Sequence, residues 1–284
     1  MNQQQDGVNQ QNPHPNHEPV DQEFVDRRGG WKGYFDTLKS NFQSKSEFWL
    51  MALKFVLFAT IYIFMAVNAL SNIIKPQHVP QCLRDLVQED TQEITDYLRD
   101  NPKIKHGIMI VGSFILDLMI LVLASRWIVY RQSIRFLYTV AFFYMLRTFT
   151  QGIFFLKMPQ DYIWDYPGFF SVVVEYFPKN DFFYSGHTGM CTLCILEFNR
   201  AKLKFWKGLA IFDLVINFFI LLVTRSHYSI DLIYGIFMGH YIYILGNRLH
   251  KYLQRRTNLK VFQDRDVPKN VELEDLIAKD KKLD

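Results

Sequence analysis

Residues 184–198 have the sequence YSGHTGMCTLCILEF, and whether this stretch crosses a membrane decides the fold of the chain. It is shorter and more polar than an ordinary spanning helix, which needs about 20 mostly apolar residues to cross a hydrocarbon core of about 30 Å. Five longer apolar segments flank it, namely 48–74, 108–130 and 136–156 before it and 205–224 and 228–246 after it. The chain therefore has either five or six spans.

The positions of the basic residues decide between the two counts. If residues 184–198 span, the basic segments at 126–135, 199–207 and 248–256 all lie on one face of the membrane, which the positive-inside rule makes cytosolic. If they do not span, the basic loop at 199–207 falls on the opposite face. We therefore predict an all-α polytopic membrane protein, a six-transmembrane-helix bundle with cytosolic N- and C-termini.

The composition agrees with a membrane protein and excludes several other classes. Of the 284 residues 49% are apolar and 16% aromatic, yet the mean hydropathy is only −0.03, so very apolar stretches alternate with polar ones. Three cysteines are too few for a disulfide scaffold. A net charge of +4 is too small to indicate nucleic acid as a partner. The sequence leaves a homo-oligomer open.

The segments outside the spans complete the expected domain organisation. We predict a disordered cytosolic tail at 1–30, an amphipathic interfacial helix at 31–47, a six-helix membrane catalytic domain at 48–247 and a cytosolic tail at 248–284. A short helix that packs on the protein itself is an equal alternative for 31–47. The chain ends with Lys281 and Lys282, which resembles a dilysine retrieval signal for the endoplasmic reticulum, although a solvated charge cluster explains the same residues.

Two short segments carry reactive side chains on the predicted non-cytosolic face. One is DFFYSGHTG at 181–189, at the start of the fourth span, and the other is RSHYSID at 225–231, at the start of the sixth. Four residues separate His227 from Asp231, which places both on one side of a helix. The carboxylate can then orient the imidazole as a nucleophile, and His187 supplies a second titratable group.

The start of the fourth span also has the features of an anion site. Ser185 and Thr188 are good helix-capping residues, and Gly186 allows close approach of a ligand to the backbone N–H groups. Arg147 and Arg225 carry guanidinium groups that match phosphate oxygens in pairs. We therefore expect a phosphate group to bind between these residues.

Other polar residues in the spans have simpler explanations. An ion pair between Arg147 and Asp117 or Asp213 is an alternative role for that arginine, and the two aspartates themselves indicate internal polar packing. Cys191 and Cys194 lack the second pair of ligands that a metal site needs, so we expect no metal. Tyr162, Trp164 and Tyr166 suit an aromatic belt at the membrane interface.

Three sequence elements together resemble a known family. They are Asp181 followed by Ser185-Gly186-His187-Thr188, then His227-Tyr228-Ser229 with Asp231, and finally Arg147 with Thr150, Leu156 and Pro159. The region from Arg147 to Asn247 is similar to the sphingomyelin synthase-like branch of the phosphatidic acid phosphatase type 2 superfamily. The Cys-Gly that usually precedes the aspartate is Lys179-Asn180 here, and the family's Leu-Pro-x-Pro is Leu-Lys-Met-Pro.

The resemblance implies a transferase that moves choline phosphate or ethanolamine phosphate from a membrane phospholipid to ceramide or diacylglycerol, with no cofactor. It implies that His227, oriented by Asp231, forms a phosphohistidine while His187 acts as acid and then base. The implied substrate-binding residues are Arg147, Asp181, Ser185, Gly186, Thr188, Arg225 and Tyr228. The expected location is the membrane of the endoplasmic reticulum or Golgi, with the active site on the lumenal face.

Two other functions remain open at this point. A lipid phosphate phosphatase would use the same chemistry with water as the acceptor, but it usually has an arginine where this chain has Leu221, and no Arg-Pro dipeptide occurs in the sequence. A non-enzymatic transporter would use the His and Asp side chains as a proton relay.

Overall fold

The structure is a computed structural model that describes residues 30–71, 83–129, 134–154, 156–176 and 182–256. These ranges contain helices and no strand. The helices are α1 (Gly30–Gln43), α2 (Lys45–Ser71), α3 (Leu86–Asp90), α4 (Gln92–Asp100), α5 (Pro102–Val129), α6 (Arg135–Ile153), α7 (Gly186–Arg200), α8 (Lys204–Val223) and α9 (Ser229–Arg256). The all-helical prediction is therefore confirmed for the described ranges.

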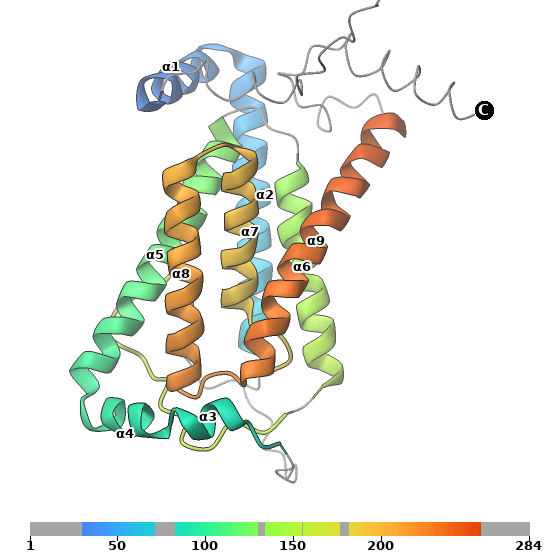
Figure 1. Ribbon diagram of the computed structural model, residues 1–284. Coiled ribbons are helices and arrows are strands. Elements are labelled where there is room, and N and C mark those ends of the chain that lie inside the picture. Colours follow the sequence, from blue (N-terminus) through green and yellow to red (C-terminus); the bar gives the residue numbers. More distant parts are fainter. Residues whose placement is uncertain (1–29, 72–82, 130–133, 155, 177–181, 257–284) are drawn as a thin grey trace, which may run out of the picture.

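Six long helices run side by side and each reverses the direction of the one before it (Figure 1). They are α2, α5, α6, α7, α8 and α9. Helix α1 and the last turns of α9 lie at one end of this bundle, and the short helices α3 and α4 lie across the other end (Figure 1). We call these the α1 end and the α3–α4 end.

Four of the long helices, α2, α5, α8 and α9, are long and apolar enough to cross a membrane. The chain is therefore a membrane protein. Helices α6 and α7 lie in the same bundle but are not among these four. The six spans and the cytosolic termini of the sequence analysis stay predictions.

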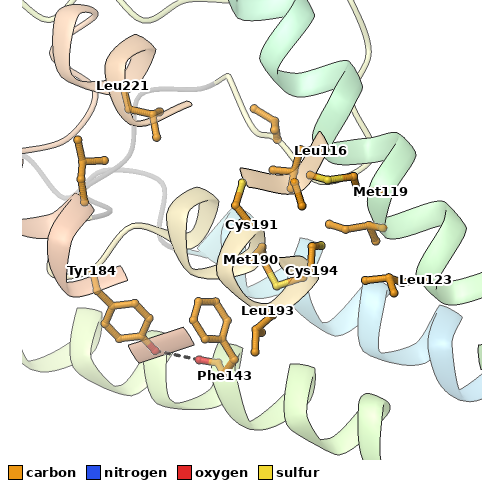
Figure 2. Close-up of a cluster of buried hydrophobic side chains, with 14 of the residues drawn as sticks. Leu116, Met119, Leu123, Phe143, Tyr184, Met190, Cys191, Leu193, Cys194 and Leu221 are labelled. Carbon is orange, nitrogen blue, oxygen red and sulfur yellow. Dashed lines mark hydrogen bonds between the residues drawn. The ribbon is translucent and has the colours of Figure 1, made fainter. Parts of the chain in front are cut away.

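Helix α7, which covers most of the decisive stretch, is buried on almost all sides. It packs chiefly against α8 and α9, and Figure 2 shows Met190 and Leu193 among side chains of the surrounding helices, including Leu116 of α5 and Phe143 of α6. A helix surrounded by protein needs to fit its neighbours, not to be soluble in lipid. This explains why a hydropathy window finds 184–198 too polar.

Glycines allow α7 and α9 to pack closely. A Cβ on Gly235 would lie 2.1 Å from Thr188 Oγ1 and 2.6 Å from the Ser185 carbonyl oxygen, and a Cβ on Gly239 would lie 2.7 Å from the Gly189 carbonyl oxygen. Glycine spaced four residues apart is a common device for close helix packing in membranes. The contact brings the first turns of α7 and α9 together at the α3–α4 end.

A buried ion pair joins three helices near the α1 end. Arg135 at the start of α6 donates to Glu197 of α7 at 2.6 Å and to Asn247 of α9 at 3.0 Å. Its guanidinium also lies over the Tyr243 ring, 5.4 Å from the centroid. Helix α7 is therefore held to its neighbours at both ends, by the glycine contacts with α9 at the α3–α4 end and by this ion pair at the α1 end.

The segments outside the predicted spans differ in detail from the expectation. The predicted interfacial helix at 31–47 is interrupted at Ser44, between α1 and α2. Asn41 of α1 donates to the Val129 carbonyl at 2.9 Å, whereas Phe35 and Phe42 are exposed, so α1 packs on the bundle and also presents an apolar face. Helix α9 continues to Arg256, into the predicted tail at 248–284. The predicted tail at 1–30 lies outside the described residues except for Gly30, and so do residues 257–284.

Candidate active site

Two histidines and one aspartate meet at the α3–α4 end. His187 lies in the first turn of α7, and His227 lies in the turn before α9, two residues ahead of its first residue, Ser229. Their ring centroids are 6.3 Å apart. Asp231, in the first turn of α9, places Oδ2 3.6 Å from His227 Nδ1. His227 is 3% exposed and Asp231 1%, so the pair is shielded from bulk water and the second ring nitrogen of His227, Nε2, is left for other contacts.

Asp231 also joins the starts of α7 and α9. Its carboxylate accepts hydrogen bonds from the backbone N–H of Phe183 at 3.1 Å and of Tyr228 at 3.2 Å. Its backbone carbonyl accepts from the N–H of Ser185 at 2.9 Å. The same residue that faces His227 therefore also fixes the segment that leads to His187.

The backbone on both sides of the site is strained. Phe183, Tyr184 and Arg225 have φ values of 92°, 99° and 58°, a region that residues other than glycine rarely adopt. Each such residue costs about 1–3 kcal/mol, and strain of this kind gathers at functional sites where surrounding contacts hold it. Here Tyr184 is held by a 2.9 Å hydrogen bond from its hydroxyl to the Phe143 carbonyl, drawn in Figure 2.

The start of α7 has the arrangement expected of an anion site. Ser185 is the N-cap residue but its side chain makes no capping bond, and its buried Oγ has no hydrogen-bond partner within the described residues. The Arg147 guanidinium lies 3.2 Å from the position a Cβ on Gly186 would take, and its Nε donates to the Tyr184 carbonyl at 3.4 Å. First-turn N–H groups lack acceptors within their own helix, so they and Arg147 offer positive ends to a phosphate.

Two other predicted substrate-binding residues make packing contacts. Thr188 donates its hydroxyl to the Leu232 carbonyl at 3.0 Å, which links α7 to α9. Tyr228 donates to the Lys157 carbonyl at 2.8 Å, and burial, reinforced by the negative charges of Asp231 and Asp85, raises the pKa of Tyr228 to about 12. Asp181 lies outside the described residues.

Arg225 is directed away from the position the sequence suggested. Its guanidinium donates to the Gln88 carbonyl, to Gln92 Oε1 at 2.9 Å and to Thr91 Oγ1 at 3.4 Å, all in the α3–α4 segment. The side chain is 1% exposed, and burial lowers the pKa of Arg225 although the charge of Asp161 opposes this. The structure therefore brings His187, His227, Asp231 and the α7 start together and packs Arg225 against another element.

Sequence reasoning missed the contribution of the α3–α4 segment to this site. Asp85 accepts from Ser229 N–H at 2.7 Å and from Ser229 Oγ at 3.0 Å, and Gln88 Nε2 donates to the His227 carbonyl at 3.0 Å. The stretch from Asp85 to Gln88 has the pattern of a helix start, with an N-cap acid followed three residues later by Gln. That local pattern carries no information about a partner 139 residues away.

Aromatic rings cover the two histidines. Trp164 meets the His187 ring edge-on at 6.0 Å and stacks on Tyr176, and Phe182 meets the His227 ring at 6.2 Å. Trp164 is 6% exposed, so it is buried against the site, whereas the sequence suggested an aromatic belt. The His227 imidazole is thereby buried, whereas His187 is only partly buried.

The remaining polar residues of the bundle have partners that match internal packing. Asp117 accepts a hydrogen bond from Ser171 Oγ at 2.9 Å and from the backbone N–H groups of Val172 and Val173. Asp213 accepts from Cys191 Sγ at 3.4 Å. Arg147 lies at the α7 start instead of pairing with either aspartate. In the part of the chain that the structure describes, no group of three His, Cys, Asp or Glu side chains could hold a metal ion.

Comparison with known proteins places the chain in a different family from the one the motifs suggested. The family model AtPDCT1/2 matches residues 84–248, more than half of the chain. This is the phosphatidylcholine:diacylglycerol cholinephosphotransferase family, whose members are phospholipid head-group transferases acting on diacylglycerol. No curated protein and no solved structure matches the chain significantly.

The assignment to the sphingomyelin synthase-like branch of the phosphatidic acid phosphatase type 2 superfamily is therefore wrong. Short motifs such as SGHT and HYSID supply groups for chemistry at phosphorus, and they carry no information about the lipid that receives the head-group. The broader prediction, a lipid phosphotransferase of the membrane, agrees with the family match.

Proposed function

Because this chain belongs to the AtPDCT1/2 family, we propose that it transfers choline phosphate from phosphatidylcholine to diacylglycerol. The single observation that carries the chemistry is the pair of imidazole rings 6.3 Å apart, one of them facing the Asp231 carboxylate, inside the region that the family model matches. A productive complex needs the phosphorus about 3–3.5 Å from the attacking nitrogen, and two imidazoles this close can act on the same phosphate group, one as nucleophile and the other as acid.

The reaction proceeds in two displacements. In the first, His227 Nε2 attacks the phosphorus of phosphatidylcholine, the bond from phosphorus to the glycerol oxygen breaks, and His187 gives that oxygen a proton, so that diacylglycerol leaves. In the second, His187 takes the proton of an incoming diacylglycerol hydroxyl, the oxygen attacks phosphorus, and the bond from phosphorus to His227 breaks. The products are a new phosphatidylcholine and the regenerated enzyme.

The other residues bind or orient. Asp231 holds His227 through Nδ1 and leaves Nε2 directed at the substrate. Arg147, the Ser185 hydroxyl and the first-turn N–H groups of α7 bind the phosphate oxygens, where fixed positive groups stabilise the charge of the transition state. Gly186 leaves room for the Arg147 guanidinium. Asp181 joins this set by its place in the motif.

The proposed setting is a membrane of the endoplasmic reticulum or Golgi. We propose six spans, in which α6 and α7 cross beside the four more apolar helices. By the positive-inside rule the basic loop at 199–207 then lies in the cytosol. The α3–α4 end, and with it both histidines, then faces the lumen.

Head-group exchange in membranes tests the proposal. Membranes that hold the full chain are supplied with phosphatidylcholine labelled in choline and with a diacylglycerol of distinguishable chain length. We expect label in phosphatidylcholine of that chain length. His187→Ala and His227→Ala each remove the transfer, by at least about a hundredfold, whereas His240→Ala, an exposed histidine on α9, leaves it unchanged.

Parallel reactions separate the other functions. Ceramide supplied in place of diacylglycerol tests the second acceptor, and release of free choline phosphate would indicate hydrolysis by water. A transporter would move no label between lipids. Transfer that survives both histidine substitutions would contradict the proposal.

A further inference from the structure

The turn that carries His227 is bound on one side by the α3–α4 segment. Hydrogen bonds join the two across more than a hundred residues of sequence, namely Asp85 to Ser229, Gln88 to the His227 carbonyl, Thr95 to the Val223 carbonyl, and Arg225 to Gln88, Thr91 and Gln92. One of these bonds, from Gln88, is made to the carbonyl oxygen of His227 itself. The segment therefore bears directly on where the imidazole sits.

We propose that Asp85, Gln88 and Arg225 are positioning residues that fix the turn before α9 and so aim His227 at the phosphorus. The proposal rests on the proposed function, because aim has a meaning only if His227 is the nucleophile. Arg225 then has a different role from the phosphate contact that its position in the sequence suggested.

The conformation of the turn explains why such support is needed. Arg225 has φ 58°, which costs about 1–3 kcal/mol for a residue other than glycine. Burial of its guanidinium adds a further cost unless hydrogen bonds satisfy the donors. The carbonyl of Gln88 and the side chains of Thr91 and Gln92 satisfy them. The α3–α4 segment therefore adds to the turn's own backbone bonds, from Arg225 N–H to Leu222 and from Ser226 N–H to Leu221, the contacts that satisfy the buried guanidinium.

Asp85 fixes the other side of the turn. It accepts from the N–H and the hydroxyl of Ser229, the first residue of α9, and it also caps α3 through the N–H of Val87. An acceptor at a helix start sets where the helix begins. Asp231 lies in the same first turn of α9 as Ser229. By holding Ser229, Asp85 therefore fixes the position of the Asp231 carboxylate relative to the His227 ring.

The family match supports this grouping of elements. It begins at residue 84, so it includes α3 and α4 together with the helices that carry the histidines, and it leaves out α1 and α2. The α3–α4 segment thus belongs to the part of the chain that defines the family.

Positioning and phosphate binding by Arg225 predict different kinetics. A phosphate contact made equally in the ground and transition states raises KM and leaves kcat unchanged. A misaimed nucleophile lowers kcat with KM unchanged, and a displacement of about 1 Å costs about a hundredfold. Gln88 carries no charge, so an effect of its substitution on kcat points to positioning.

The test compares Gln88→Met, Asp85→Asn and Arg225→Lys with the control Glu89→Gln in the full chain in membranes. Glu89 lies on the same short helix, is exposed and pairs only with Arg84 in the described part of the chain. Two measurements are made. The first gives kcat and KM for head-group exchange, and the second gives the rate at which diethylpyrocarbonate modifies His227 relative to His187, read by mass spectrometry of the peptides. Gln88→Met is chosen in place of Gln88→Ala because methionine nearly keeps the side-chain volume and removes only the hydrogen bond to the His227 carbonyl.

We expect kcat to fall about ten- to a hundredfold in the three variants with KM unchanged, and His227, which is 3% exposed in the native protein, to be modified faster relative to His187. The control keeps both values. Variants that match the control in kcat and in labelling overturn the proposal, and so does a rise in KM with constant kcat in Arg225→Lys. Lack of exchange by the native protein would overturn the proposed function alone, because the labelling rates still decide whether the α3–α4 segment positions His227.

Discussion

Asp231 shows how much of the site one side chain can organise. One carboxylate oxygen faces His227 Nδ1 and also accepts from Tyr228 N–H, and the other accepts from Phe183 N–H. The carboxylate can therefore orient the imidazole only while it also holds the start of α7. The orientation of the His227 imidazole and its distance to His187 therefore depend on the same group.

Substitution Asp231→Asn keeps the shape of the side chain but gives one of its two positions an NH₂ group. That NH₂ cannot accept both from a backbone N–H and from an imidazole N–H, so His227 loses its orientation. We expect kcat for head-group exchange to fall about 10²–10⁴-fold, measured as labelled phosphatidylcholine formed from labelled donor. Asp36→Asn, at an exposed site on α1, is the control. Equal rates for the two variants would show that Asp231 has no part in the reaction.

Tyr228 predicts a dependence of stability on alkaline pH. The pKa of its phenol is raised to about 12 in the folded protein, against an ordinary value of about 10. Between these values the folded state keeps a proton that the unfolded state has lost, so stability is constant below pH 10 and falls as pH rises toward 12. Tyr228→Phe should lose about 1 kcal/mol at pH 8, with its bond to the Lys157 carbonyl.

Melting temperature measured from pH 8 to pH 12 in detergent checks this. Above pH 10 the melting temperature of the native protein should fall more steeply with pH than that of Tyr228→Phe. Parallel curves for the two proteins over that range would exclude a buried phenol at this position.

Single residues also show where sequence reasoning stops. The spacing of His227 and Asp231 predicts their contact because four residues make one helical turn. The pairing of Arg225 with Gln88 depends on how the chain folds back over 137 residues. Charge suggested a phosphate for Arg225, and only the fold shows that backbone and amide oxygens occupy its donors.

At the scale of elements, the distance between the histidines is set by how closely α7 and α9 pack. Gly235 and Gly239 on α9 face Ser185, Thr188 and Gly189 on α7, and each position has no room for a Cβ. The two helices carry the two histidines at their adjacent starts. Any side chain between them would move His187 away from His227.

Gly235→Ala tests this contact. The added methyl group meets Thr188 Oγ1 and the Ser185 carbonyl oxygen, so we expect the free energy of unfolding to fall by about 1–3 kcal/mol. We also expect kcat for head-group exchange to fall, because His187 moves away from His227. Gly208→Ala on α8, where a Cβ meets nothing within 4 Å, is the matched control and should gain up to about 1 kcal/mol from helix propensity. Melting temperature and kcat are measured for both variants. Gly235→Ala behaving like Gly208→Ala would show that the packing leaves room.

The elements themselves follow the sequence closely, with instructive exceptions. The spans expected at 205–224 and 136–156 correspond to α8 (Lys204–Val223) and α6 (Arg135–Ile153), because their apolar runs have clear ends. Helix α5 starts at Pro102, before the apolar run that marks its span, since proline suits the first position of a helix. Helices α3 and α4 were not expected at all, because they are short and polar and are ordered by contacts to the turn before α9.

At the scale of the whole molecule, the two ends of the bundle carry different features, the candidate active site at one end and basic residues at the other. The starts of α7 and α9, next to which His187 and His227 lie in the sequence, and the α3–α4 segment are at one end (Figure 1), and α1 and the basic last turn of α9 lie at the other. Whether a bilayer separates the ends depends on the stretch at 184–198, which becomes α7 and the residues just before it.

Cysteine labelling decides that question. Cys82 is replaced by serine, and the buried Cys191 and Cys194 are kept. Single cysteines are then introduced by Glu93→Cys on α4 and by Lys204→Cys at the start of α8, both at exposed positions at opposite ends of α7 and its neighbours. In sealed vesicles with the cytosolic face outward, a maleimide that cannot cross membranes should label the cysteine at 204 at once and the cysteine at 93 only after detergent is added. Helices α7 and α8 pack against each other and α8 is apolar enough to span, so we expect their shared loop and the α3–α4 end to lie on opposite faces. Labelling of both positions in intact vesicles would mean that α7 and α8 do not cross the bilayer, and the active site would then lie on the same side as the basic loop.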